Sequence, residues 1–205
     1  MKDGTFNFCA KKEVSRGKYP KGGRKMAVNS ILDIHVFIAR AREDLRAIFR
    51  LRYEVYCLET KSLTAANYPR GEEVDRFDAY SLHIIAKNKS GEAIGTMRLI
   101  PDGPHGFLME ESFELPDWID RARTVEHSRE IVRKDYRGYG ITNILESIAH
   151  AWQKRHGFGI CIGAADAERM APILFKKGWR QIGIPRVYHG ITAIPVALVL
   201  DHHKK

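Results

Sequence analysis

The sequence is poor in cysteine and has no long apolar run. Its three cysteines, Cys9, Cys57 and Cys161, lack the paired spacing of a zinc site or a disulfide framework. The longest apolar run, residues 191–200, contains Pro195 and is too short for a membrane helix, so it indicates a buried strand. The N-terminus is basic but lacks the apolar core of a signal peptide. We therefore expect a soluble, cytoplasmic protein.

Excess charge is scarce outside the N-terminal region. Residues 1–28 hold eight Lys and Arg against two Asp and Glu, a net +6 of the +9 of the whole chain, which leaves +3 for the remainder. A domain with so little excess charge is not expected to bind nucleic acid. The pattern predicts a flexible basic tail over residues 1–28, capable of weak contact with a membrane surface. Residues 29–205 are long enough for a single domain with a sizeable core.

Hydrophobic periodicity predicts strands that alternate with helices. The expected strands are residues 31–39, 81–87, 93–100, 124–132 and 159–164, with two more after Trp179, and the expected helices are residues 42–59, 117–123, 141–156 and 167–177. Elements in this order are typical of an α/β domain. Residues 103–114 are expected to form a loop in which Phe107, Leu108 and Met109 are exposed.

The strand over residues 124–132 is unusually polar for its place between helices. Such a strand normally has two buried apolar faces. Strand alternation puts its side chains on two faces, with Glu126, Ser128 and Glu130 on one and His127, Arg129 and Ile131 on the other. Buried charge needs a partner or a task, so this strand is either a salt-bridged scaffold or part of an active site.

Other charges stand where apolar residues are expected. Arg52 interrupts the apolar stripe of the first helix, and Arg98 lies on the apolar face of its strand. Each needs a counter-ion or a route to solvent. Two acidic residues, Asp75 and Asp78, are matched in number by two basic residues, Arg98 and Arg129. A structural salt-bridge network and direct substrate contact are therefore equally consistent with these four residues.

The loop after the polar strand leads into a helix. Residues 137–142, Arg-Gly-Tyr-Gly-Ile-Thr, place glycines and backbone N–H groups at the helix start. The first N–H groups of a helix have no intrahelical partner and attract anions. Because Gly-x-Gly before a helix is common, a simple tight turn is the alternative interpretation.

Together these motifs resemble the GNAT acetyltransferase superfamily. Its members hold a pyrophosphate or phosphopantetheine phosphate in an Arg/Gln-x-x-Gly-x-Gly/Ala loop, from which this chain departs at Thr142. Four further motifs resemble the acyl-homoserine lactone synthases within the superfamily: Arg52 before Val55-Tyr56, Asp75-x-x-Asp78, residues 95–101, and Glu126-x-Ser128-Arg129. Residues 49–57, Tyr68-Pro69 and Ser81-x-His83 are similar to the acyltransferases of the PEP-CTERM/exosortase system, which themselves resemble N-acyl amino acid synthases.

The resemblance implies a GNAT-like mixed central sheet flanked by helices, and roles for particular residues. Glu126 is the implied base, acting directly or through water, with Ser128 on its face. The implied donor-binding residues are Ile131, Val132, Arg133, Arg137, Gly138, Tyr139, Gly140, Ile141 and Thr142. Leu174 and Phe175 stand where relatives usually carry a tyrosine acid, so proton delivery to the thiolate must come from elsewhere, or the thiolate leaves unaided.

We therefore expect an N-acyltransferase that moves a long-chain acyl group from acyl carrier protein, or from coenzyme A, to a small-molecule amine, with an amino acid favoured. The alternatives are an acyl-homoserine lactone (autoinducer) synthase using S-adenosylmethionine, and a non-catalytic module that binds acyl carrier or nucleic acid. No permanently bound cofactor is expected. No metal is expected either, because Glu146 and His150 share a helical face but lack a third ligand at a suggestive spacing.

Acidic acyl carrier protein would need a basic surface on which to dock. Two groups of basic residues are available. They are Arg42, Arg46 and Arg50 on the first helix, and Arg133, Lys134 and Arg137 beside the loop. A solvated helix face is the alternative interpretation for the first group.

Overall fold

One mixed sheet connects the elements of the computed structural model, which describes residues 7–12, 32–188 and 191–200. The nine-stranded sheet has the order β1-β2-β3-β4-β5-β6-β9-β7, with β8 paired to β9. Among the strands of the described residues, only β5 and β6 pair in parallel. The strands are β1 (Asn7–Lys12), β2 (Leu32–Ala39), β3 (Leu82–Asn88), β4 (Ala93–Pro101), β5 (Thr124–Val132), β6 (Ile160–Asp166), β7 (Arg180–Gln181), β8 (Arg186–Tyr188) and β9 (Ile191–Val199).

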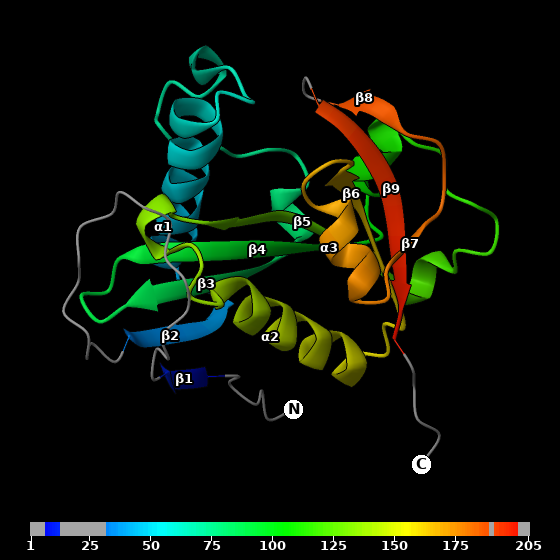
Figure 1. Cartoon of the computed structure of the whole chain (residues 1–205). Coiled ribbons are helices and arrows are strands. Elements are labelled where there is room, and N and C mark those ends of the chain that lie inside the picture. The colour runs from blue at the N-terminus through cyan, green and yellow to red at the C-terminus, as the bar shows by residue number, and fades with distance from the viewer. Residues whose placement is uncertain (1–6, 13–31, 189–190, 201–205) are drawn as a thin grey trace.

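Two helices cover opposite faces of the sheet (Figure 1). The first, α1, spans Arg42–Tyr53 and continues as a π-helical segment over Glu54–Glu59. The second, α2, spans Ile141–Arg155, and a short helix, α3, spans Ala171–Lys176. Apolar residues at helical spacing give α2 a buried stripe toward the sheet, as expected for an amphipathic helix.

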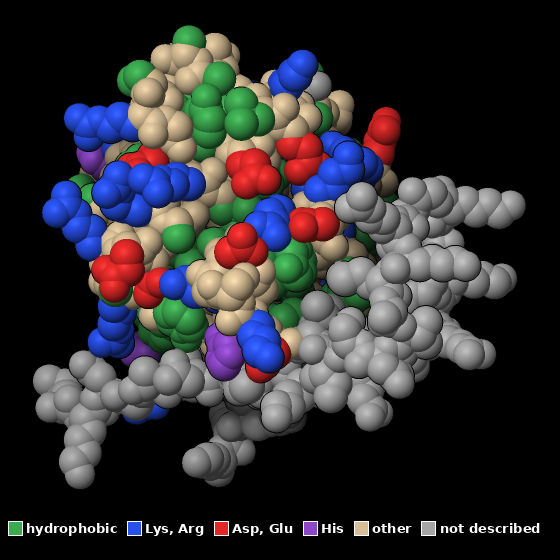
Figure 2. Space-filling view, turned by 90° about the vertical axis from the view of Figure 1, so that its left-hand side faces the viewer, with side chains coloured by type: hydrophobic (Ala, Val, Ile, Leu, Met, Phe, Trp, Pro, Cys, Tyr) green, Lys and Arg blue, Asp and Glu red, His purple; other side chains and the backbone are tan. Residues whose placement is uncertain are grey.

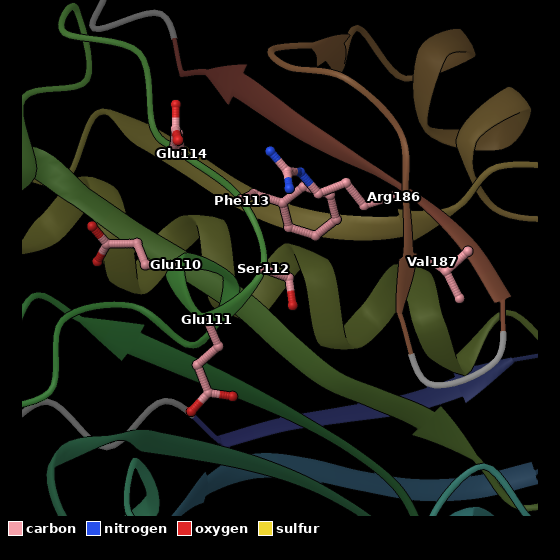
Figure 3. A pocket seen from close by; sticks show the side chains of 7 residues that line it. All are labelled: Glu110, Glu111, Ser112, Phe113, Glu114, Arg186 and Val187. Atoms are coloured by element: carbon pink, nitrogen blue, oxygen red, sulfur yellow. The ribbon is translucent and has the colours of Figure 1, made fainter.

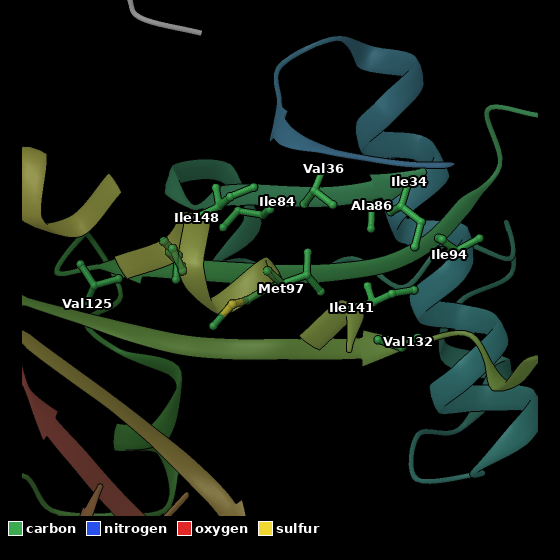
Figure 4. Packing of buried hydrophobic residues seen from close by; sticks show 13 residues of the cluster. Ile34, Val36, Ile84, Ala86, Ile94, Met97, Val125, Val132, Ile141 and Ile148 are labelled. Atoms are coloured by element: carbon green, nitrogen blue, oxygen red, sulfur yellow. The ribbon is translucent and has the colours of Figure 1, made fainter. Parts of the chain in front are cut away.

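Strand alternation distributes the core between the two faces. Ile84 and Ala86 of β3 pack in the cluster that contains Leu145 and Ile148 of α2 (Figure 4). The residue between them, Ile85, packs in a second cluster with α1. Both faces of β3 are thus buried at its centre, which explains why residues 84–86 are all apolar rather than alternating with polar residues.

Strand β5 contains a bulge. Thr96 of β4 pairs with Ile131, whereas Arg98 pairs with Ser128, so β5 holds one extra residue between these pairs. Arg129 has a φ of 51°, in the left-handed region that non-glycine residues rarely adopt.

The bulge overturns the predicted faces of β5. Arg129 joins Ser128 on the α1 face, where both contact one network of charged residues. Glu130 moves to the α2 face, where it feels the charges of Glu146 and Lys177. The prediction that Glu130 shares a face with Glu126, and Arg129 with His127, is therefore wrong, because an inserted residue shifts the alternation by one.

Strands β5 and β6 separate after a short contact. They pair only at Thr124–Ile160, Val125–Cys161 and Glu126–Ile162, after which β6 continues alongside β9. At the point of separation a Cβ on Gly163 would lie 3.1 Å from the carbonyl oxygen of His127, a tighter contact than most side chains make, so glycine favours the close approach. Beyond Glu126, the β6-facing edge of β5 therefore has no strand partner in the described part of the chain.

Several predicted elements differ from the structure. Residues 7–12, assigned to the flexible tail, form the edge strand β1 against β2, while the rest of that predicted tail lies outside the described residues. The predicted helix over residues 117–123 is only a short 3-10 turn at Arg121–Arg123. Helix α3 is shorter than predicted, and three strands rather than two follow Trp179.

The loop expected to expose apolar residues instead buries them. Phe107, Leu108 and Met109 are all buried, and Phe107 and Met109 pack with β6 and β9. Across the described ranges, no helix combines the length and apolar character that crossing a bilayer requires.

Candidate active site

A pair of buried salt bridges to Arg52 of α1 forms one part of the site. The Arg52 side chain is fully buried. Its Nη1 and Nη2 donate to the two carboxylate oxygens of Asp78 at 2.7 and 3.1 Å, and its Nε donates to Glu73. A guanidinium held in this forked geometry is a strong and directional contact.

Two further arginines extend these contacts into a closed network. Arg98 of β4 donates through Nη1 to Asp75 at 2.6 Å and to Asp78 at 2.7 Å, and through Nε to the Ser128 hydroxyl at 2.9 Å. Arg129 donates through Nη2 to Glu73 at 3.0 Å and to Asp75 at 3.1 Å. Three arginines therefore face three carboxylates, and the network is electrically balanced.

The network keeps its members charged despite burial. Burial alone would raise the pKa of Asp78, but the guanidinium groups of Arg52 and Arg98 hold that pKa well below its usual range. Glu73 is fully buried and completes the charge balance, yet it was not predicted as a site residue. Its position next to Glu72 in an acidic run concealed its role, because the partly buried Glu72 contacts Arg46 and Arg50 instead.

His83 is a second residue that was missed as part of the site. It is buried, lies 3.7 Å from Asp78, and stacks edge-on against Phe49. Burial lowers the pKa of His83 to about 4, so the ring is neutral near pH 7. Among the described residues its two ring nitrogens and Nη2 of Arg98 have no hydrogen-bond partner. These atoms leave polar capacity for a small ligand or water.

Glu126 lies on the same face as Ser128, as predicted, and is 2% exposed. One carboxylate oxygen accepts the backbone N–H of Met109 at 3.1 Å. Burial raises the pKa of Glu126 to about 7, against the opposing effects of that N–H and of Arg98. A carboxyl group with a pKa near neutrality is suited to general acid–base chemistry, because both protonation states are populated.

Tyr188 of β8 approaches the same region from a distant part of the sequence. Burial raises the pKa of Tyr188. The positive charge of Arg129, to which the phenol is hydrogen-bonded, lowers this pKa, and the negative charge of Glu126 raises it. The phenol therefore keeps its proton at neutral pH. Its three-residue strand carries no sequence signal that would have identified it.

A cavity of about 370 Å³ opens beside the turn that covers Glu126 (Figure 3). Its lining residues come from the segment after Met109 and from β8 across from it. They are Glu110, Glu111, Ser112, Phe113, Glu114, Arg186 and Val187. The cavity thus presents carboxylates on one side and a guanidinium on the other.

The predicted anion loop has open backbone geometry. Gly138 and Gly140 have φ values of 83° and 75°, which glycine adopts without strain. Gly140 precedes α2, and no side chain caps that helix. The N–H groups of the first turn, at Ile141 and Thr142, are therefore available to an anion.

Most of the side chains described around this loop already have partners within the fold. Arg137 donates through Nε to the Val132 carbonyl and through Nη1 and Nη2 to Glu59, so it ties the loop to the π-helical segment. The Ile141 side chain is buried in the α2 core and Ile131 in the α1 core, so neither is available to a ligand through its side chain. Arg133, paired with Asp135, lines a cavity of about 590 Å³ next to the loop.

Arg98→Ala tests the network. We expect the variant to lose about 3–5 kcal/mol of unfolding free energy, because Asp75 and Asp78 each lose one of two arginine partners and the network keeps an uncompensated negative charge. Urea unfolding measures this loss. Arg76→Ala is the matched control, since Arg76 and Glu111 form an exposed pair that should contribute less than about 1 kcal/mol. An Arg98→Ala variant as stable as the parent would contradict the network.

Glu126→Gln tests the burial of that carboxyl. The pKa of Glu126 rises from an ordinary 4.5 to about 7 on folding, so the native state binds the extra proton between those values. The associated stability is complete below pH 4.5 and is lost as the pH rises through about 7. Relative to the parent, the variant should gain up to about 3 kcal/mol between about pH 5 and about pH 8. Identical pH dependence of urea unfolding in the two proteins would exclude the shift.

Comparisons with known proteins agree with this architecture. Residues 51–146 match the acetyltransferase (GNAT) domain family, while no curated protein matches the sequence. BjaI, a CoA-dependent acyl-homoserine lactone synthase solved with SAM and isopentyl-CoA, is 20% identical over 78% of each chain, with a TM-score of 0.65. TofI, solved with an inhibitor and MTA, is 20% identical over 81% of this chain and 91% of its own, with a TM-score of 0.65.

A third solved structure belongs to another class of acyl transfer. An acyl-CoA N-acyltransferase from Pseudomonas aeruginosa is 17% identical over 81% of this chain and 98% of its own, with a TM-score of 0.57. At these identities the structural likeness shows the fold, and the family match spans Arg52, Arg98 and Glu126. Residues 51–146 thus match the GNAT domain family, and the chain has the fold of these solved acyltransferases.

Proposed function

We propose that this protein is an acyltransferase that moves a long-chain acyl group from a thioester on acyl carrier protein, or on coenzyme A, to the amine of an amino acid. One observation carries the proposal: β5 places a buried carboxyl of near-neutral pKa where an unpaired strand edge begins, and that edge leads to the uncapped start of α2. The strand edge suits an extended pantetheine arm and the helix start suits its phosphate.

The donor would lie along the open edge of β5. The N–H of Arg133 already donates to the carbonyl of Ile94 in β4. Because successive N–H groups of a strand point to opposite edges, the N–H of Val132 faces the open edge and is the better partner for a pantetheine amide. The carbonyl of Arg133 already accepts the N–H of Tyr136, so neither backbone group of Arg133 is left for the donor. The N–H groups of residues 138–142 would receive the phosphate.

Glu126 would act as the base. It is 2% exposed, so we assign it the removal of the amine proton through a water molecule rather than by direct contact. The amine nitrogen then bonds to the thioester carbon and the carbon–sulfur bond breaks. The thiolate needs a proton, and α3 offers no hydroxyl group. Protonated Glu126 or the phenol of Tyr188 can supply it.

The acceptor would enter through the cavity beside Glu126. Its lining carries glutamates and Arg186, which match the ammonium and carboxylate groups of an amino acid. Glu110 and Glu111 are already paired with Arg121 and Arg76, so Glu114 is the exposed carboxylate that would attract the amine.

Acyl-homoserine lactone synthesis is the second candidate function. The structural likeness to BjaI and TofI favours it, since BjaI was solved with SAM and TofI with MTA. The two candidates share the thioester donor and differ in the acceptor.

Glu126→Gln should lower acyl transfer by about a hundredfold, the usual contribution of a general base, while the fold is retained. Release of free thiol from an acyl thioester in the presence of amine measures the rate. Glu168→Gln, a change of the same kind at an exposed site, is the control and should leave the rate unchanged. Near-parental turnover in Glu126→Gln would remove Glu126 from the mechanism.

The donor is tested by competition. We expect long-chain acyl carrier protein to outcompete acetyl-coenzyme A, and added salt to weaken it, because the docking charges are exposed. Figure 2 shows Lys and Arg interspersed with Asp and Glu on the side of the molecule at the left of Figure 1, so docking would rely on local groups. Changing Arg42, Arg46 and Arg50 to Gln should raise the KM for the carrier. The same loss of charge at Lys154, Arg155 and Lys176 should not.

The product decides between the two functions. Lipid extracts of a bacterial host that expresses the protein would be compared by mass spectrometry with extracts of a host that expresses Glu126→Gln. N-acyl amino acids would support the proposal, and acyl-homoserine lactones would replace it with the second candidate. The absence of any new acylated product would contradict both.

A further inference from the structure

A cluster of soft ligands lies on the face of the sheet opposite the arginine–carboxylate network. His127 comes from β5, Cys161 from β6 and His150 from α2. One potential ligand atom from each lies within 4.8 Å of the other two. The sequence offered only Glu146 and His150 at metal-ligand spacing, and the tertiary structure brings the other two side chains to His150. Glu146 instead pairs with Lys177.

The hydrogen bonds in this cluster are incomplete. Nε2 of His127 lies 3.0 Å from the amide oxygen of Gln153, and the amide nitrogen of Gln153 donates to the sulfur of Cys161 at 3.2 Å. Nε2 of His150 is buried and has no partner among the described residues. A buried polar atom without a partner is costly unless a ligand, ion or water satisfies it.

Coordination requires neutral imidazoles and a deprotonated thiol. Burial lowers the pKa of His127 to about 3 and also lowers that of His150, so both rings are neutral near pH 7 and have a free lone pair. Burial raises the pKa of the Cys161 thiol to about 12, so binding of a metal ion must displace one proton from sulfur.

We propose that His127, His150 and Cys161 form a site for a thiophilic divalent ion such as Zn²⁺, with the amide oxygen of Gln153 or a water as the fourth ligand. Tetrahedral zinc with bonds of about 2.0–2.3 Å places its ligand atoms about 3.4–3.6 Å apart. The three side chains need to close by little more than about 1 Å to reach that geometry, which small torsion changes can supply. Because Cys161 is fully buried, the site has the closed character of a structural zinc centre.

The position of the site gives the ion a mechanical role. The last pair between β5 and β6 is Glu126–Ile162, and His127 is the next residue of β5. An ion bound to His127, Cys161 and His150 would therefore join β5, β6 and α2 at the point where the two strands separate. It would fix the spacing of the two strands there without touching Glu126 on the other face.

Cobalt provides a direct test on the full chain after chelation. We expect one equivalent of Co²⁺ to produce thiolate-to-cobalt charge transfer and the visible bands of tetrahedral cobalt, and Zn²⁺ to displace it and raise Tm. Cys161→Ser should abolish the charge-transfer band, and His150→Gln should weaken binding at least tenfold. Cys57→Ser, at the other buried cysteine, should change neither.

Each outcome decides the matter. Unfolding curves recorded without metal show whether each variant is folded. If one of the two ligand variants, Cys161→Ser or His150→Gln, does not fold, the other still tests the site. The proposal is overturned if the folded parent shows no thiolate–cobalt band, if the band persists in Cys161→Ser, or if Cys57→Ser removes it. Because the readouts are spectral and thermal, they are independent of the proposed acyl transfer.

Discussion

The structure depends on the neutralisation of buried arginines. Arg52 and Arg98 have no access to water, and a single buried guanidinium would cost several kcal/mol. Glu73, Asp75 and Asp78 lie in one short segment and face three arginines from α1, β4 and β5. The segment between α1 and β3 therefore acts as an anionic strap that fixes the helix to the two central strands. Arg98 of the same network also donates to Ser128, on the face of β5 that carries Glu126.

The bulge at Arg129 makes this arrangement possible. Without the extra residue, strand alternation would direct Arg129 toward α2, away from Glu73 and Asp75. The positive φ at Arg129 is an uncommon conformation, and the ion pairs made by its side chain offset the strain. The bulge also sends Glu130 to the α2 face, where burial raises its pKa to about 8 and leaves it largely protonated at neutral pH. One inserted residue thus places Arg129 and Glu130 on different faces of the sheet.

The two faces of β5 carry different kinds of polar groups. The α1 face carries the charge network and Glu126, and it is closed by the turn at Met109 and by β8. The α2 face carries neutral imidazoles and a thiol between the sheet and the helix. Between them runs the open edge of β5, which exists because β6 separates from β5 after only three pairs while it stays paired with β9 along its whole length. The groups of both faces therefore lie on opposite sides of the same strand edge.

The sequence by itself determined the α/β class, the positions of the central elements, and the charged residues that needed partners, because periodicity and misplaced charge are local signals. The mixed sheet was implied by the family resemblance. Arg52, Asp78 and Arg98 were identified in this way and do meet. Only the tertiary structure decided the faces of β5, the inclusion of Glu73 and Tyr188, and the burial of Met109. A bulge changes register without changing composition, and contacts between residues distant in the chain leave no spacing to detect.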